Sequence, residues 1–234
     1  MARRRAGGLT PVSEARIVSV RAGRVRMHPL PEWDRGERST WRSAYGKDEV
    51  AGPVFVGALG LDGDEQAHLD VHGGPQMAVL AYAQAHYAHW REVPGLERMG
   101  PGGFAENLTL DGPFDEASVC IGDVIEAGGV VFEVSSPRGP CSAISRWWNE
   151  PSMVKRATEH ARIGWYHRVK LEGLIEAGDT YRLVERPQPQ WTIARVFRAR
   201  VRPDRDAGEL RALTTLPGLS PEWHGHFRHL LERA

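Results

Sequence analysis

The segment at residues 135–141, SSPRGPC, places a thiol close to a guanidinium in a stretch that two prolines keep out of regular structure. Proline fixes φ and lacks a backbone donor, and Gly139 permits a tight or left-handed path, so a stiff turn is predicted. Arg138 lies three residues before Cys141. Nearby positive charge lowers a thiol pKa and favours the thiolate, which binds metals and attacks electrophiles. Cys141 is therefore a candidate metal ligand or nucleophile; the competing interpretation is a small buried hydrophobe.

Three further glycine-rich turns also follow predicted strands. They cover residues 62–64, 72–75 and 102–107, and they present His72, Gly73, Gly74, Glu106 and Asn107. Exposed glycine N–H groups beside an arginine form a pocket for a phosphate. A cysteine at such a pocket can ligate a metal that a phosphorylated cofactor already holds. The competing interpretations are a structural role for His72 and a loop-bridging role for Asn107.

Other chemistries find less support in the sequence. A structural zinc site needs about four closely spaced Cys/His ligands, but the chain has two cysteines and no Cys-x-x-Cys. The zinc-deaminase signature, a Walker loop and a Gly-x-Gly-x-x-Gly helix start are also absent. Cysteine hydrolysis, with Cys141 as nucleophile and His72 as base, stays open. Cys120 is assigned to core packing within a predicted strand.

The overall composition is typical of a globular protein that folds in water, with 41% hydrophobic and 26% charged residues among 234. Lys+Arg and Asp+Glu are both 30, so no net charge attracts the chain to nucleic acid or an anionic membrane. No apolar run approaches the roughly 20 residues of a membrane helix, and no apolar stretch follows the basic N-terminus as in a secretory signal. These features predict reduced thiols and a cytoplasmic protein.

The pattern of elements predicts a mainly β, α+β chain with a barrel-like core. Predicted strands cover 17–20, 24–27 (as its hairpin mate or continuation), 52–61, 77–82, the end of region 100–110 after its glycine-rich loop, 119–125 (interrupted at 122–123), 130–134, 165–171 and 180–184, the last two paired with each other. Helices are predicted at 83–90, 142–148 and 151–162. Residues 29–45 show no clean period and are predicted to form a long loop on the core.

Three regions are predicted along the chain: a disordered arm at 1–14, the barrel at 15–187, and a three-helix subdomain at 188–234 after the linker PQPQ. Ser220 is the expected N-cap of the last helix, which carries an apolar stripe and three histidines on its solvated side. Three short helices bury too little surface to fold alone. They are expected to pack on the barrel or on a second subunit, which favours a homodimer.

Seven short motifs, taken in order, make the chain resemble a MOSC-domain protein of the YiiM type. They are GLDGDEQ at 60–66, VHGGP at 71–75, FAENL at 104–108, IGD at 121–123, PRGPC at 137–141, GWY at 164–166 and AGD at 177–179. Each motif alone is weak, whereas the shared order over residues 43–187 is specific. The predicted three-helix tail also resembles the helical extension of this subgroup.

The resemblance implies a MOSC-like β-barrel that binds molybdenum cofactor, with Cys141 as the molybdenum ligand. Residues placed by it near the pterin phosphate or the open face of the metal are His72, Gly73, Gly74, Asn107, Ser136 and Arg138, with His72 also a candidate proton donor. At the level of the domain family it also implies pyridoxal phosphate binding. A soft thiolate suits molybdenum that two dithiolene sulfurs already hold.

The activity that the resemblance implies is reduction of N-hydroxylated compounds, such as 6-hydroxylaminopurine, as in the mitochondrial amidoxime reducing enzymes. Two cysteines cannot hold a four-cysteine iron–sulfur cluster and no flavin fingerprint is visible, so a separate electron-donor reductase is expected. The expected partners are thus this reductase and a small N-hydroxylated substrate, without nucleic acid or membrane. The alternative is a non-catalytic cofactor carrier or a sulfur-transfer module that uses Cys141 as a persulfide.

Overall fold

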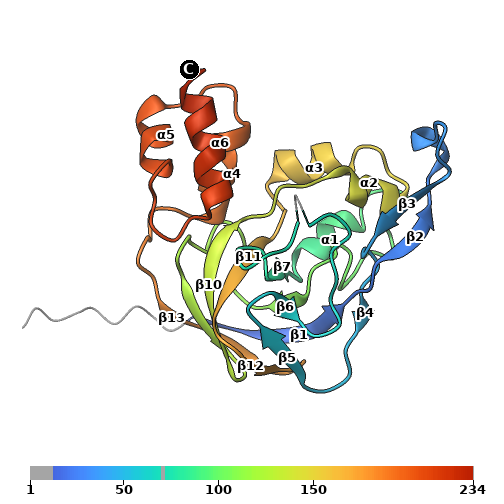
Figure 1. Ribbon diagram of the computed structural model, residues 1–234, viewed down its shortest axis with the longest axis horizontal. Coiled ribbons are helices and arrows are strands. Elements are labelled where there is room, and N and C mark those ends of the chain that lie inside the picture. The colour runs from blue at the N-terminus through green and yellow to red at the C-terminus, as the bar shows by residue number, and fades with distance from the viewer. Residues whose placement is uncertain (1–12, 70–71, 234) are drawn as a thin grey trace, which may run out of the picture.

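The computed structural model describes residues 13–69 and 72–233, and in this part of the chain seven strands close into a barrel (Figure 1). The strands are β1 (Glu14–Ala22), β7 (Val79–Ala83), β8 (Leu108–Asp111), β9 (Val124–Ala127), β10 (Val130–Pro137), β11 (Trp165–Leu171) and β13 (Thr180–Glu185). Their order is β13-β9-β10-β11-β7-β8-β1, and β1 pairs back onto β13. Closure leaves no free edge between these strands. The predicted barrel core is confirmed.

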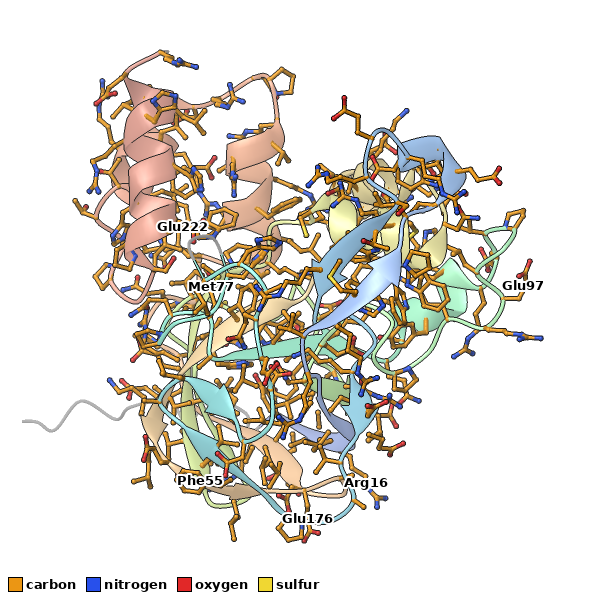
Figure 2. All side chains as sticks on the ribbon, turned by 45° about the vertical axis from the view of Figure 1, so that its right-hand side comes forward. Arg16, Phe55, Met77, Glu97, Glu176 and Glu222 are labelled. Carbon is orange, nitrogen blue, oxygen red and sulfur yellow. The ribbon has the colours of Figure 1, made fainter. Side chains whose placement is uncertain are left out.

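Apolar side chains from every part of the barrel fill its interior. Ile17, Val20, Phe132, Val134 and Trp165 are completely buried. Strand β7 is buried along its whole length, as expected for the unbroken apolar run VLAYA. Seen from the side, Met77 lies toward the C-terminal helices and Glu176 lies at the opposite end of the barrel (Figure 2). The barrel is therefore a packed core, and its two ends carry different loops.

Short accessory strands flank the barrel. Strand β4 (Asp48–Glu49) pairs with β1. A small sheet contains β5 (Val54–Gly57), β6 (Gly60–Leu61) and β12 (Gly173–Ile175). A separate hairpin joins β2 (Arg26–Pro29) to β3 (Thr40–Ser43), with the 3-10 turn η1 (Glu32–Asp34) between them.

Two predictions about the first part of the chain were wrong. The predicted strand 24–27 is neither a hairpin mate nor a continuation of β1, because β2 pairs with β3. Residues 29–45 consequently contain a strand and a 3-10 turn rather than one long loop. The predicted arm at 1–14 lies outside the described residues except for its last two positions, and Glu14 already belongs to β1.

Two further strand predictions were also wrong. Segments 165–171 and 180–184 do form strands, but β11 lies between β10 and β7 while β13 lies between β9 and β1. Closing the barrel requires these non-local neighbours, so proximity in sequence misled the pairing. Within 119–125, only the end enters a strand, β9, and Cys120 makes a single bridge to Thr192.

Helices cover one end of the barrel and build the C-terminal subdomain. The helices are α1 (His86–Trp90), α2 (Ser142–Trp148), α3 (Met153–His160), α4 (Ile193–Val201), α5 (Ala207–Leu213) and α6 (Pro221–Leu231). Figure 1 shows α4, α5 and α6 as one group beside β10. The Ser220 N–H donates to the carbonyl of Ser135 at 2.9 Å, and Arg168 donates to Gly218. The predicted three helices are confirmed, and they pack on the barrel.

The last helix departs from one expectation and follows one of the two alternatives given for its apolar stripe. Ser220 occupies the N-cap position, but its side chain makes no capping hydrogen bond. Trp223 and Phe227 of the apolar stripe are buried by this same chain. The stripe therefore needs no second subunit to cover it, and the homodimer stays a prediction. Within the described residues, no helix is long and apolar enough to cross a membrane.

Candidate functional site

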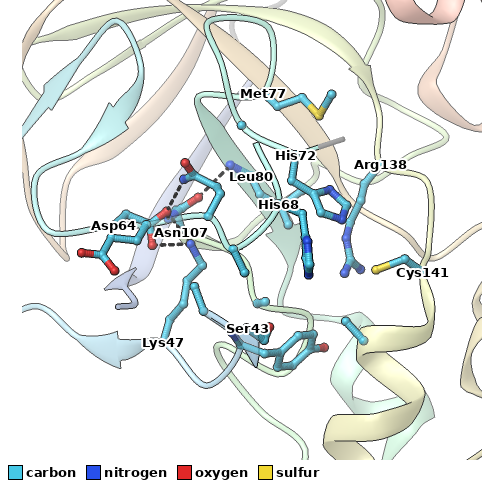
Figure 3. Close-up of a pocket in the computed structure, with 18 of the residues that line it drawn as sticks. Ser43, Lys47, Asp64, His68, His72, Met77, Leu80, Asn107, Arg138 and Cys141 are labelled. Carbon is cyan, nitrogen blue, oxygen red and sulfur yellow. Dashed lines mark hydrogen bonds and ion pairs between the residues drawn. The ribbon is translucent and has the colours of Figure 1, made fainter. Parts of the chain in front are cut away.

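A cavity of about 230 Å³ opens at the helical end of the barrel, where loops from distant parts of the chain meet (Figure 3). Its walls include Ser43, Tyr45, Lys47, Asp64, His68, His72, Gly73, Met77, Leu80, Asn107, Arg138, Cys141 and Tyr166. The segment after β3, the loop between β6 and β7, and the turn after β10 supply most of them. The fold thus brings His72, Gly73, Asn107, Arg138 and Cys141 to one cavity.

Cys141 is half-buried at the start of α2 and lies on the cavity wall. Burial raises the pKa of its thiol, but this is outweighed by the hydrogen bond with His72, the charge of Arg138 and the Ala143 N–H. Together they lower the pKa from 9.0 to about 7. A substantial thiolate fraction at neutral pH follows, as the proximity of Arg138 in the sequence suggested.

Arg138 is a buried cation of the cavity, close to Cys141 in the sequence. It is 5% exposed, and its guanidinium lies 5.8 Å from the centre of the Phe104 ring. Within residues 13–69 and 72–233, its Nη1 has no hydrogen-bond partner and no carboxylate forms an ion pair with it. A buried, unpaired guanidinium is costly unless an anion or acceptor binds it. The side chain is therefore suited to holding an anionic group beside Cys141.

His72 and Gly73 form the wall facing Cys141. The His72 N–H donates to the His68 carbonyl at 2.8 Å. Gly73 and Gly74 are both in the left-handed region, with φ of 85° and 76°, so side chains there are strained. Gly73 lines the cavity, but Gly74 does not. A Cβ on Gly74 would meet no atom within 4 Å, which places it on the open side of the turn.

Asn107 lines the cavity, but its side-chain amide is hydrogen-bonded to other groups of the protein. Its Oδ1 accepts from the Leu80 N–H at 3.0 Å. Its Nδ2 donates to the Arg21 carbonyl at 3.1 Å and to Asp64 Oδ2 at 3.0 Å. Both amide protons are therefore used, and the loop-bridging interpretation describes this contact set better than cofactor binding does.

Ser136 does not reach the cavity. It is 2% exposed on β10, opposite Tyr166 in the barrel register, and lies outside the cavity lining. The strand continues to Pro137 and buries this residue, so the structure does not bring Ser136 to the cavity, and its cofactor contact stays a prediction. The φ of Gly139 is also outside the left-handed region expected for it. The rigid turn depends on its prolines and on the Arg138 N–H bond to Gly164.

A buried ion pair at the other end of the cavity was not singled out from the sequence. Lys47 Nζ bonds both carboxylate oxygens of Asp64, whose side chain is 2% exposed. Burial lowers the pKa of Lys47, and Asp64 opposes that shift. Asp64 also accepts from the Gly23 N–H at 2.8 Å. The available signal was the rarity of lysine, since Lys47 is one of three in the chain.

The remaining candidates are structural. Glu106 is fully buried and accepts from Tyr87, Thr109 and the N–H groups of Gly102 and Phe104. Cys120 is 1% exposed, in agreement with core packing. Burial and Asp123 raise its pKa to about 11. Within the described ranges, no group of three His, Cys, Asp or Glu side chains can hold a metal ion, so a metal there would have to bring most of its ligands.

Comparison with known proteins gives two family matches that together span most of the chain. Residues 68–182 match the MOSC domain, and residues 191–234 match the YiiM-like, 3-alpha helix domain. The crystal structure of YiiM from Geobacillus stearothermophilus is similar, with a TM-score of 0.75 and 30% identity. That likeness covers 93% of this chain and 99% of the YiiM chain.

Two curated relatives are similar in sequence. A protein named Reductase from Gibberella moniliformis is 40% identical over 190 residues, which is 79% of this chain and 32% of the relative. Protein YiiM of Escherichia coli is 36% identical over 146 residues, or 62% of this chain and 65% of the relative. The chain thus spans about a third of the fungal protein and just under two thirds of the bacterial one. It belongs to the MOSC-domain proteins of the YiiM type.

Proposed function

We propose that this chain reduces N-hydroxylated compounds with a molybdenum cofactor held in the cavity, where Cys141 ligates the metal. The observation that carries the proposal is a thiol that lines the same cavity as a buried guanidinium whose Nη1 has no hydrogen-bond partner in the described chain. Membership of the MOSC family and similarity to a protein named Reductase support it.

The residues of the cavity fit such a cofactor. The Cys141 thiolate offers one soft ligand, which is sufficient where a dithiolene supplies the others. Arg138 offers a fork of donors to an anionic group such as a phosphate, and Gly73 allows close approach of its wall. Asn107, Asp64 and Lys47 keep the opposite wall in place through their hydrogen bonds.

When bound, the molybdenum centre supplies two-electron chemistry, and the overall reaction is R–NHOH + 2 e⁻ + 2 H⁺ → R–NH₂ + H₂O. His72 lines the same cavity as Cys141, and its imidazole could supply a proton to the oxygen that leaves as water. Tyr166 borders the same space, and burial, first among several causes, raises its pKa, so it stays a neutral hydrogen-bond donor. These side chains bind and protonate, while the electrons come from elsewhere.

The electron donor is proposed to be a separate reductase. Cys120 and Cys141 cannot together hold an iron–sulfur cluster of four cysteines. The relative named Reductase is about three times as long as its match to this chain, which agrees with a reducing unit outside the matched part. A cytoplasmic location and a small-molecule substrate likewise stay predictions.

The test is to purify the protein from a host that makes the cofactor, and to measure bound molybdenum and benzyl-viologen-driven reduction of 6-hydroxylaminopurine. We expect about one molybdenum per chain in the wild type and in Cys120→Ala, the matched control, and a loss of metal in Cys141→Ala. Equal metal content in wild type and Cys141→Ala would contradict the ligand role. Bound cofactor or sulfane sulfur without turnover would favour a carrier or sulfur-transfer module, and an acyl-enzyme burst without metal would favour a hydrolase.

A further inference from the structure

A groove leads out of the Cys141 cavity beneath the β2–β3 hairpin. Two more cavities, of about 380 and 580 Å³, share Trp41 and Arg146 with the first one. Arg42 and His68 belong to both the first cavity and the larger of the two. The hairpin, which carries Trp41 and Arg42, and α2, which carries Arg146, lie next to each other in Figure 1. The three cavities therefore adjoin one another around Trp41 and Arg146, next to the cavity that holds the thiol.

Trp41 is the aromatic surface of this groove. Its ring is half-buried, 5.5 Å from the His28 ring and 5.6 Å from the Arg146 guanidinium. His28 lies directly opposite Trp41 in the hairpin register, and Arg146 forms an ion pair with Asp34. These contacts hold the indole in a defined orientation: the Arg146 guanidinium lies over the ring, and the part of Trp41 that stays accessible lines the groove. A fixed aromatic face is a stacking platform for a planar base.

Two exposed arginines provide the positive charge. Arg38 and Arg42 line the groove, and neither guanidinium has an ion pair or a side-chain hydrogen bond with the described part of the chain. Glu37 also lines the groove, without an ion pair there, and it offsets one positive charge. Arginine binds phosphate in a bidentate manner. The remaining charge suits a single phosphate better than a polyphosphate chain.

We propose that the groove is a nucleotide subsite, in which a base stacks on Trp41 and Arg38 and Arg42 bind a phosphate. Neither the nucleotide's binding nor its place in the groove requires the proposed reaction. The identity of the occupant does rest on the proposed function, and it has two sources: an N-hydroxylated base presented as its nucleoside monophosphate, or a nucleotide attached to the cofactor. In both cases a base and a phosphate would bind in the groove next to the Cys141 cavity.

The first experiment titrates the cofactor-free full chain with adenosine 5′-monophosphate by calorimetry. We expect binding that Arg38→Ala/Arg42→Ala weakens by about tenfold or more, since two charge-assisted contacts are lost. Both arginines are exposed, so folding is expected to be unaffected. Arg211→Ala, an exposed arginine on α5, is the matched control and is expected to bind like the wild type. Absence of binding, or equal binding by the double variant, would overturn the proposal whether or not the protein is a reductase.

The second experiment distinguishes the two sources. Acid release of one nucleotide per molybdenum from the loaded protein would assign the groove to the cofactor. Release of none, together with a kcat/KM for 6-hydroxylaminopurine riboside monophosphate at least about tenfold above that of the free base, would assign it to substrate. This preference must disappear in Arg38→Ala/Arg42→Ala. If neither nucleotide release nor phosphate preference is found while the free base is reduced, the subsite is refuted and the proposed function stands.

Discussion

Replacing His72 by glutamine tests the electrostatic origin of the Cys141 thiolate in the metal-free protein. The hydrogen bond with His72 is the largest contribution that lowers the pKa of Cys141, ahead of the charge of Arg138. With a pKa of about 7 instead of 9.0, about half of the thiol is ionised at pH 7 rather than about 1%. Glutamine cannot carry a positive charge and can donate only a neutral hydrogen bond, which is weaker than the charge-assisted bond that an imidazolium donates to a thiolate, so His72→Gln is expected to raise the pKa of Cys141 by about one unit.

The assay is the pH dependence of iodoacetamide alkylation, monitored by intact mass. A Cys120→Ala background leaves one thiol, and Cys120 itself is buried with a pKa of about 11. The wild-type rate should reach half its maximum near pH 7, and His72→Gln should react about tenfold more slowly at pH 6. His68→Gln changes another histidine of the same cavity and is the control expected to leave the midpoint in place. A His72→Gln midpoint within a few tenths of the wild type would refute the reasoning.

Three further predictions concern stability. Burial lowers the pKa of His167 from 6.5 to about 4, so the unfolded chain takes up a proton that the folded one rejects, and the unfolding free energy should fall by about 3 kcal/mol from pH 6.5 to 4. Urea titrations over this pH range should show no such fall of the unfolding free energy in His167→Gln. A fall of the same size in this variant would exclude the effect. Asn107→Ala should lower the unfolding free energy by about 2 kcal/mol, because the Leu80 N–H and Asp64 lose a partner; a loss below about 0.5 kcal/mol would show that water replaces the amide. Gly46→Ala should cost at least about 1 kcal/mol more than Gly52→Ala, since both glycines have positive φ but only at Gly46 would a Cβ collide, 2.2 Å from the Trp147 ring; equal melting temperatures would refute the steric argument.

Local patterns in the sequence were sufficient for many elements. The predicted strands at 130–134 and 165–171 correspond to β10 and β11. The three C-terminal helices followed from their apolar spacing. These features depend on neighbours within a few residues, which is why they can be recognised without a partner surface.

Strand pairing and the hydrogen-bond partners of buried side chains could not be predicted from local patterns. Strands β11 and β13 pair with different neighbours because barrel closure is a property of the whole sheet. The amide of Asn107 is used by Leu80, Arg21 and Asp64, which are 27, 86 and 43 residues away. No local pattern indicates that such groups will be in contact.

By itself, the sequence determined the rigid turn that carries Arg138 and Cys141, and the ordered motifs that identify the MOSC family. Both are encoded in contiguous residues, whose prolines and glycines restrict the backbone directly. Only the tertiary structure decided that His72 and Cys141 line one cavity, that Ser136 is buried outside its lining, and that Arg138 is buried with its Nη1 unpartnered in the described chain. Those outcomes depend on the strand register of the barrel and on which residues, distant in sequence, hydrogen-bond to each buried polar group. Both are determined by the packing of the complete fold.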